Sequence, residues 1–179
     1  MVSQPSTQPI RGGELPSYTL QVGEQSPGER TVGPDVKLRL KAPDGTVETP
    51  WAIDLGAGLY RLDNIPFFAY GVSADDVVQA APEDDGYLAF TRVVKSSGNR
   101  TLRIAFKDKV TKTEPLLARL SEMGVGWEGA FAKLIALSVP PRVDIEKVIE
   151  LLTQSGEDWE YANPTWDELH PGEGRALTP

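Results

Sequence analysis

The sequence of 179 residues has no cysteine and one histidine, His170. The absence of cysteine excludes thiolate catalysis, disulfide frameworks and cysteine-ligated zinc or iron-sulfur sites. A single histidine also excludes histidine-rich metal sites, and a Ser-His-Asp triad would depend on a residue in a C-terminal segment with the composition of a tail. We therefore expect no metal site, no cofactor and no catalytic residues, and we interpret His170 as a surface residue.

Positive charge and long apolar runs are also scarce. The chain has 18 Lys and Arg against 26 Asp and Glu, a formal net charge of -8 that repels phosphate backbones and argues against nucleic-acid binding. No apolar run approaches the roughly 20 residues of a membrane helix, and the N-terminus lacks the apolar centre of a signal peptide. We expect a cytoplasmic protein that does not enter a membrane.

The two ends of the chain differ in composition from its middle. Residues 1–34 are rich in proline and glycine, which predicts a flexible arm, with one strand-like island at Tyr18–Val22. Residues 164–179 are expected to form a C-terminal tail. The stretch between them, residues 35–163, is long enough to form a single domain with its own core.

The first half of this domain, residues 35–98, has the pattern of short strands and tight turns. In VKLRLKA, apolar residues at 36, 38 and 40 alternate with cations, and the Asp44-Gly45 pair that follows is typical of a hairpin turn. Further strands are predicted around residues 46–55, 59–65, 76–80 and 87–94. With no long helix among them, they predict a small curled sheet or barrel.

In the second half, residues 99–163, helices alternate with strands. Thr113 and Gly124 bound one helix pattern, and Asp144 and Gly156 bound another. The predicted strands are TLRIAF, VGWEGAF, KLIALSV and WEYA. The order β-α-β-β-α-β is that of the ferredoxin-like fold, so the predicted fold class is α+β: a β-rich N-terminal half followed by a ferredoxin-like half.

The stretch NIPFFAYGVSADD, residues 64–76, joins two predicted strands and is unusually rich in rings. It can be a buried plug that closes the β-rich half, because large rings in a connection usually pack inward. It can also be the wall of a ligand or partner pocket, with Phe67, Phe68 and Tyr70 as aromatic walls. Asn64, Tyr70, Asp75 and Asp76 would then supply polar groups. Adjacent carboxylates in a strand point to opposite faces, so the two aspartates are poor candidates for a catalytic pair.

Two further candidates lie in the second half. Arg100 and Arg103 in SSGNRTLRI could clamp a phosphate or carboxylate, or could belong to a solvated salt-bridge face that answers the acidic residues 75, 76 and 83–85. Trp127, between two glycines, could be an exposed anchor for a protein partner, or could cover the neighbouring helix.

The run WAIDLGAGLYRLDNIPFFAYGVSADDVVQA, followed by VVKSSGNRTLRIAF, resembles a bacterial family catalogued as domain of unknown function 4265. The likeness spans roughly residues 36–161 and leaves the N-terminal arm outside it. Its most specific parts are Trp51, residues 64–71, Asp76 to Val78, Ser97-Gly98 and residues 101–103. The resemblance implies a single-domain cytosolic protein and supplies no catalytic residues.

These observations favour a non-enzymatic binding module that recognises another protein, of the immunity or regulatory-accessory kind. The absence of a catalytic constellation, the acidic charge and the proline-rich arm motivate this hypothesis. The alternative is a small-molecule sensor or an enzyme that uses an aromatic pocket around residues 64–76.

Overall fold

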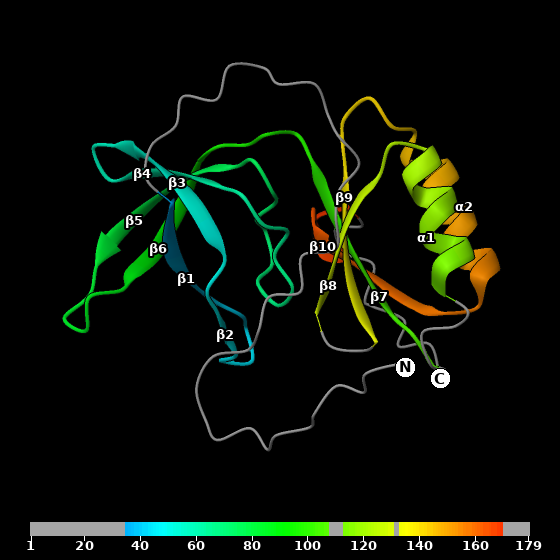
Figure 1. Ribbon diagram of the computed structural model, residues 1–179, viewed down its shortest axis with the longest axis horizontal. Helices are drawn as coiled ribbons and strands as arrows, with labels where there is room; N and C mark the ends of the chain where they lie inside the picture. Colours follow the sequence, from blue (N-terminus) through cyan, green and yellow to red (C-terminus); the bar gives the residue numbers. More distant parts are fainter. Residues whose placement is uncertain (1–34, 108–112, 131–132, 170–179) are drawn as a thin grey trace, which may run out of the picture.

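The computed structural model describes residues 35–107, 113–130 and 133–169. The predicted arm with its Tyr18–Val22 strand, His170 and the end of the predicted tail lie outside these ranges. The described part is mostly β, with ten strands and three helices, of which α1 and α2 are longer than one turn. It has two halves that lie side by side in Figure 1.

The first half is a closed five-stranded barrel (Figure 1, left). Its strands are β1 (Asp35–Lys41), β3 (Trp51–Gly56), β4 (Leu59–Leu62), β5 (Val77–Pro82) and β6 (Leu88–Lys95). Successive strands pair antiparallel, and β6 closes the barrel by pairing parallel with β1. A two-residue strand, β2 (Val47–Glu48), pairs with the end of β1. The β-rich half is thus a barrel rather than an open curled sheet.

Local sequence explains the strands and turns of the barrel. Leu38 and Leu40 of β1 are buried, as their alternation with charged residues predicts. Ala57 and Gly58 both have positive φ, 54° and 74°, which is the backbone of a two-residue type I′ turn between β3 and β4. Pro50 separates β2 from β3, because a proline has no N–H to donate to a ladder.

The second half is a four-stranded antiparallel sheet in the order β10-β7-β9-β8. Its elements follow one another as β7 (Arg100–Ala105), α1 (Thr113–Glu122), β8 (Gly126–Ala130), β9 (Leu134–Val139), α2 (Ile145–Ser155) and β10 (Asp158–Asn163). Both helices lie on the same face of the sheet (Figure 1). The other face is turned toward the barrel.

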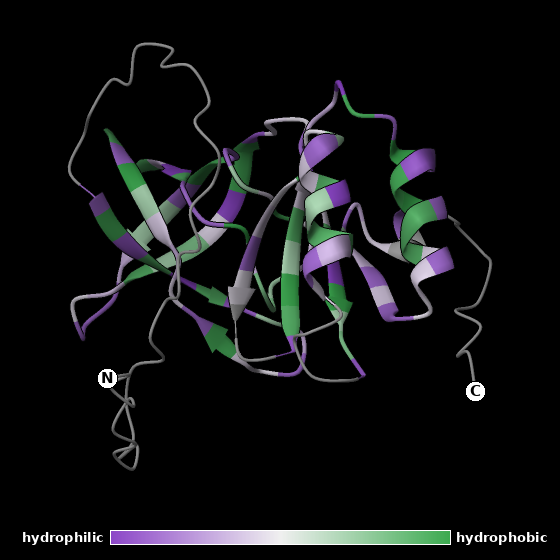
Figure 2. Cartoon of the chain, turned by 45° about the vertical axis from the view of Figure 1, so that its right-hand side comes forward, coloured by the Kyte–Doolittle hydropathy of each residue, from purple (hydrophilic) through white to green (hydrophobic). Residues whose placement is uncertain are grey.

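The helices form where the sequence predicts them. Leu116 and Leu120 of α1 and Leu152 of α2 are buried, and apolar (green) and polar (purple) segments alternate along both helices in Figure 2. Asp144 caps α2, its carboxylate accepting a hydrogen bond from the N–H of Glu146 at 3.1 Å. Gly156 ends α2 in the left-handed conformation with φ 72°.

A large apolar cluster joins the helices to the sheet. Each fully buried Leu, Ile or Val side chain stabilises the fold by about 1.5–3 kcal/mol. The buried members are Leu102, Ile104, Phe106, Leu116, Leu117, Leu120, Val125, Ile135, Leu137, Val139, Val143, Val148, Leu151 and Leu152. A separate cluster, built around Leu38, Leu62 and Val78, fills the barrel.

The region predicted to be a tail begins with a short helix, α3 (Trp166–Leu169). Thr165 and Glu168 form a reciprocal cap, in which the Thr165 N–H donates to Glu168 at 2.6 Å and the Glu168 N–H donates to the Thr165 hydroxyl at 3.3 Å. This is the capping-box pattern, which is a sequence signal for the start of a helix. The prediction of a tail was made from composition and did not use this signal. Within the described ranges, no helix is long and apolar enough to cross a membrane.

Candidate functional site

Residues 63–76, which we call the connector, join β4 to β5 and lie against the sheet face that the helices leave uncovered. Ile65 and Ala74 of the connector are buried with Ala136 of β9, and Phe67 packs against them. Alternation along β7 and β9 turns most of their large apolar side chains toward the helices, whereas mainly small or polar ones, together with Leu134, face the connector. The connector therefore fills the space between the two halves.

Glu48 of the short strand β2 holds the middle of the connector. Its carboxylate accepts three backbone N–H groups in succession, from Phe67 at 2.7 Å, Phe68 at 3.0 Å and Ala69 at 2.6 Å. Successive N–H groups that converge on one anion form a concave nest that orders the backbone. This contact fixes the backbone that carries the two phenylalanine rings.

Glu128 of β8 holds the start of the connector. Its carboxylate accepts hydrogen bonds from the Ile65 N–H at 3.0 Å and from the Asn64 side chain at 3.1 Å. Asn64 in turn accepts the N–H of Trp51 at 2.9 Å, which ties β3 of the barrel to the same point. Burial raises the pKa of Glu128 above its ordinary range, and the two hydrogen bonds oppose that rise.

Arg103 of β7 is the most deeply placed cation of the site, with 4% of its surface exposed. Its guanidinium donates to Glu160 of β10 at 3.1 Å and to the carbonyl oxygen of Ala69. It also lies 4.5 Å from the ring centroid of Tyr70, whose hydroxyl donates to Glu160 at 2.9 Å. The Arg103 Nε is the one buried side-chain nitrogen or oxygen without a hydrogen-bond partner in the described part of the chain.

Asp76 fixes the end of the connector, where the chain enters β5. Its buried carboxylate accepts the N–H of Ser73 at 2.8 Å and the N–H of Ser97 at 2.7 Å. Ser73 also shares a hydrogen bond of 2.7 Å with Thr101 of β7, and its hydroxyl accepts from Asn163 of β10 at 2.8 Å. Asp76 is therefore a structural acceptor, and it does not line the groove described next.

A groove of about 360 Å³ opens between the turn after β1, the connector and the four-stranded sheet, and we call it the connector groove. It is lined by Ala42, Pro43, Asp44, Phe67, Phe68, Tyr70, Arg103, Leu134 and Glu160. Four of the residues singled out from the sequence, the three aromatic ones and Arg103, thus line one hollow. Asp44 at its rim is exposed, and a hydrogen bond from the backbone of Thr46 lowers the pKa of this carboxyl.

The other predicted site residues lie elsewhere. Asp75 is exposed in a left-handed turn with φ 65°, next to the buried Asp76. Arg100 and Arg103 fall on opposite faces of β7, so they cannot clamp one anion together. Trp127 packs against the apolar cluster under the helices and donates its indole N–H to Ser121 of α1 at 3.0 Å. Trp127 thus covers the neighbouring helix, the second of its two interpretations.

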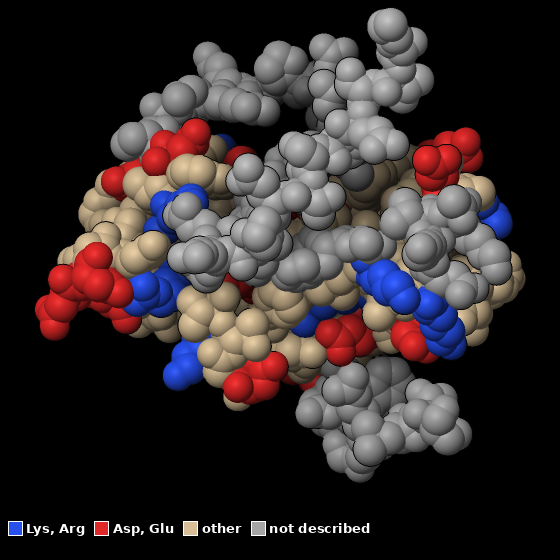
Figure 3. Space-filling view, turned by 60° about the horizontal axis from the view of Figure 1, so that its bottom comes forward, with Lys and Arg blue, Asp and Glu red and all other residues tan. Residues whose placement is uncertain are grey.

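The acidic residues of the β5–β6 turn form ion pairs with Arg39, and not with Arg100 or Arg103 as considered from the sequence. Arg39 of β1 pairs with Glu83 and with Asp85, the latter at 2.8 Å, and stacks on the Tyr87 ring at 4.3 Å from its centroid. In Figure 3, acidic side chains gather at the barrel end of the molecule. Arg103 takes no part in that face, because it is buried under the connector.

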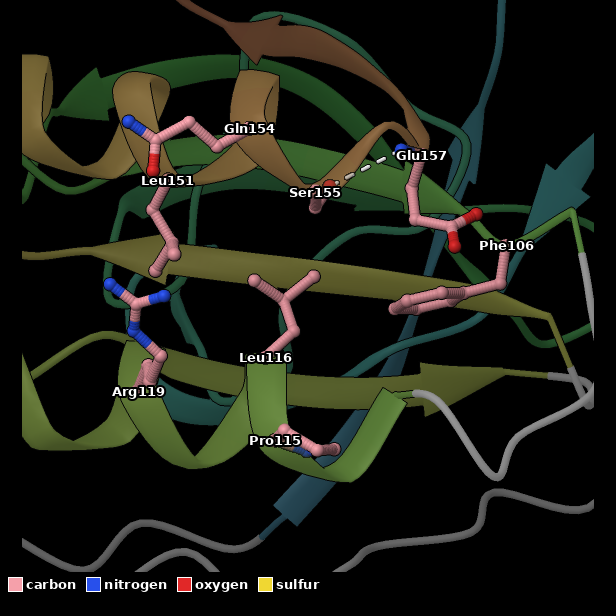
Figure 4. A pocket seen from close by; sticks show the side chains of 8 residues that line it. All are labelled: Phe106, Pro115, Leu116, Arg119, Leu151, Gln154, Ser155 and Glu157. Carbon is pink, nitrogen blue, oxygen red and sulfur yellow. Dashed lines mark hydrogen bonds between the residues drawn. The ribbon is translucent and has the colours of Figure 1, made fainter.

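A second hollow, of about 410 Å³, lies between the two long helices (Figure 4). Leu116 of α1 and Leu151 of α2 point toward each other across it, and Phe106 closes one end. None of the candidate site residues predicted from the sequence lines this hollow. Among the described residues, no group of three or more acidic or histidine side chains is placed to hold a metal ion.

Comparison with known proteins gives a family and a fold. The sequence model described as "Domain of unknown function (DUF4265)" matches residues 48–161. The chain belongs to this family. The matched range includes β3 to β9 and the whole connector, and it ends within β10. No curated protein matches the sequence.

The chain is also similar to a solved structure described as "Novel crystal structure of a hypothetical protein from Neisseria gonorrhoeae". The two share 18% sequence identity with a TM-score of 0.56, and the match covers 75% of this chain and 96% of that one. At this level of identity the likeness concerns the fold alone.

Proposed function

We propose that this protein is a non-catalytic binding module that recognises another protein through the connector groove. The observation that carries the proposal is the groove itself, in which Phe67, Phe68 and Tyr70 stand on a backbone held by side chains from both halves. Aromatic rings that are fixed before binding lose little conformational freedom on binding, which is why they serve as anchors at protein interfaces.

The acidic balance of the chain supports a protein partner over a nucleic acid. The formal net charge of -8 would repel phosphates and would speed association with a basic partner. The proposal places the protein in the cytoplasm as a single domain.

The strand order β10-β7-β9-β8, with both long helices on one face, supports the assignment of the second half as a ferredoxin-like unit. That fold serves many functions, so the functional argument depends on the groove and not on the fold.

The test is affinity capture from the native cells with three forms of the full-length protein: wild type, Phe68→Ser in the groove and Val94→Ser on β6. Val94 is an exposed apolar residue of the barrel, 43% accessible, and serves as the matched control. The proposal expects a stoichiometric protein partner that wild type and Val94→Ser retain and that Phe68→Ser loses. Retention by all three forms would show that the groove is not the binding surface.

A second candidate function is the sensing of a small molecule in the same groove. Its volume of about 360 Å³ lies within the range of ligand pockets, about 300–1,000 Å³. A metabolite that binds the folded state must raise the melting temperature. A thermal-shift screen of wild type and Phe68→Ser would favour this function if a metabolite stabilises only the wild type and no protein is captured.

A further inference from the structure

We infer that the connector groove accepts a cationic side chain, foremost an arginine, presented by the protein partner. This inference rests on the proposed function and specifies the chemistry of the partner at that site. It follows from three features of the groove: the charge of its lining, the way that it already binds one guanidinium, and its aromatic surface.

The lining of the groove carries negative charge. Two carboxylates, Asp44 and Glu160, and one guanidinium, Arg103, contribute side chains to it. Glu160 and Arg103 form an ion pair at 3.1 Å, which leaves the exposed carboxylate of Asp44 as the unbalanced charge among the lining residues. An anionic ligand would meet this carboxylate, whereas a cation would gain an ion pair with it.

The groove already shows the chemistry by which it would bind a guanidinium. Arg103 stacks on Tyr70 and pairs with Glu160, so an aromatic ring and a carboxylate together hold one guanidinium of the chain itself. On the barrel, Arg39 likewise stacks on the ring of Tyr87 and pairs with a carboxylate. Lys37 lies 5.1 Å from the ring centroid of Trp51. Aromatic faces attract cations through their quadrupole, and arginine adds planar stacking to this attraction.

Phe67, Phe68 and Asp44 supply the same two kinds of group, an aromatic ring and a carboxylate, elsewhere in the lining of the groove. Phe67 and Phe68 are half-buried and line the hollow, and Asp44 lies at its rim. A partner arginine could lay its guanidinium on a phenylalanine face and direct an N–H to the Asp44 carboxylate. Lysine would use the same groove with a weaker fit, because its ammonium cannot stack.

The test is an NMR titration of the full-length protein with a capped glycine-arginine-glycine peptide, compared with the same peptide carrying citrulline. Citrulline keeps the shape of arginine and lacks its charge. The inference expects amide shifts at residues 67–70, and binding of the citrulline peptide about tenfold weaker. Equal binding of the two peptides, or shifts confined to another surface, would overturn it.

Asp44→Asn and Asp84→Asn give the matched pair of variants, because both aspartates are exposed and both changes remove one negative charge. Asp44→Asn is expected to weaken the arginine peptide about three- to fivefold, and Asp84→Asn to leave it unchanged. An equal loss in both variants would show attraction by bulk charge and would refute a site in the groove. A partner that is captured through Phe68 but presents no cation would end this inference and leave the proposed function standing.

Discussion

The two faces of the four-stranded sheet are held by different forces. The face toward the helices is covered by leucine, isoleucine and valine, without a buried charge among the cluster members. The face toward the connector has a small apolar patch around Ile65 and Ala136. Its other contacts are polar, and they include those of Arg103, Glu128 and Glu160. Apolar burial fixes the first face, and directional hydrogen bonds position the second.

The two faces of the sheet therefore have different roles, one in stability and one in positioning the connector. An apolar interface tolerates shape-conserving substitutions and contributes stability. A polar one contributes less net stability but fixes a backbone in one arrangement, which is what a preformed binding groove requires. The segment that covers the second face also carries Phe67, Phe68 and Tyr70, which line the connector groove.

The largest effect is expected on the helix face. Leu120 is fully buried, so Leu120→Ala should lower the free energy of unfolding by about 2–5 kcal/mol through lost burial and a residual cavity. Urea denaturation measures the loss. Arg119→Ala, at an exposed position of the same helix, is the control and should change stability by less than about 0.5 kcal/mol. A loss below about 1 kcal/mol for Leu120→Ala would contradict the apolar account of this face.

On the connector face, the largest loss of stability is expected from substitution of Arg103. Arg103→Met removes the ion pair with Glu160 and the donor to Ala69. We expect the free energy of unfolding to fall by about 2–3 kcal/mol, less than for a fully buried pair because 28% of the Glu160 side chain is exposed. Lys107→Met breaks the exposed pair with Asp158 and should cost less than about 1 kcal/mol. If the two variants lose the same amount in urea denaturation, Arg103 does not hold the connector.

A smaller loss is expected at Glu48. Glu48→Gln keeps one acceptor oxygen but removes the negative charge that three N–H groups share. The free energy of unfolding should therefore fall by about 1–2 kcal/mol. Glu122→Gln, at an exposed position of α1, should stay within about 0.5 kcal/mol of wild type. An unchanged denaturation midpoint for Glu48→Gln would mean that the nest contributes nothing to stability.

The smallest effect concerns pH and Glu128. Burial raises the pKa of this carboxyl in the folded state, so the folded state binds more protons than the unfolded state. Stability should therefore fall as the pH rises from the ordinary glutamate pKa, about 4.3, through the raised value, and the favourable contribution is lost above it. Glu128→Gln should flatten this part of the stability-against-pH curve. An identical slope in wild type and variant would contradict the assignment.

The helix face of the sheet could be predicted from sequence because its signals are local. Apolar residues three and four apart mark α1 and α2, and caps at Asp144 and Gly156 mark the ends of α2. Alternation likewise predicted β7, and Leu102 and Ile104 are buried as expected. The family resemblance noted for the sequence is confirmed by the match over residues 48–161.

The connector face could be predicted only in part. Ring content drew attention to residues 64–76, but the residues that hold them, Glu48, Glu128 and Glu160, stand singly in short strands and carry no sequence signal. Their roles depend on which strands the topology brings together. The parallel pairing of β6 with β1 has the same origin, since a closed barrel depends on contacts between distant segments.

The environment of Arg103 could not be predicted from the sequence. Its place in TLRIAF predicts a side chain opposite the apolar face, and we expected solvent or a bound anion there. The connector instead covers that face, and two of the three guanidinium nitrogens donate to Glu160 and to the carbonyl oxygen of Ala69. A sequence pattern states which face a side chain occupies, whereas only the tertiary structure states what covers that face.

The most direct test of the central claim is hydrogen exchange at the amides of Phe67, Phe68 and Ala69 in the full-length protein. If the connector is a fixed wall of the groove, these three amides exchange as slowly as those of β7, and Glu48→Gln speeds them selectively while α1 keeps its protection. Exchange in the wild type at the rate of an exposed loop would show that the groove is not preformed and would contradict the account.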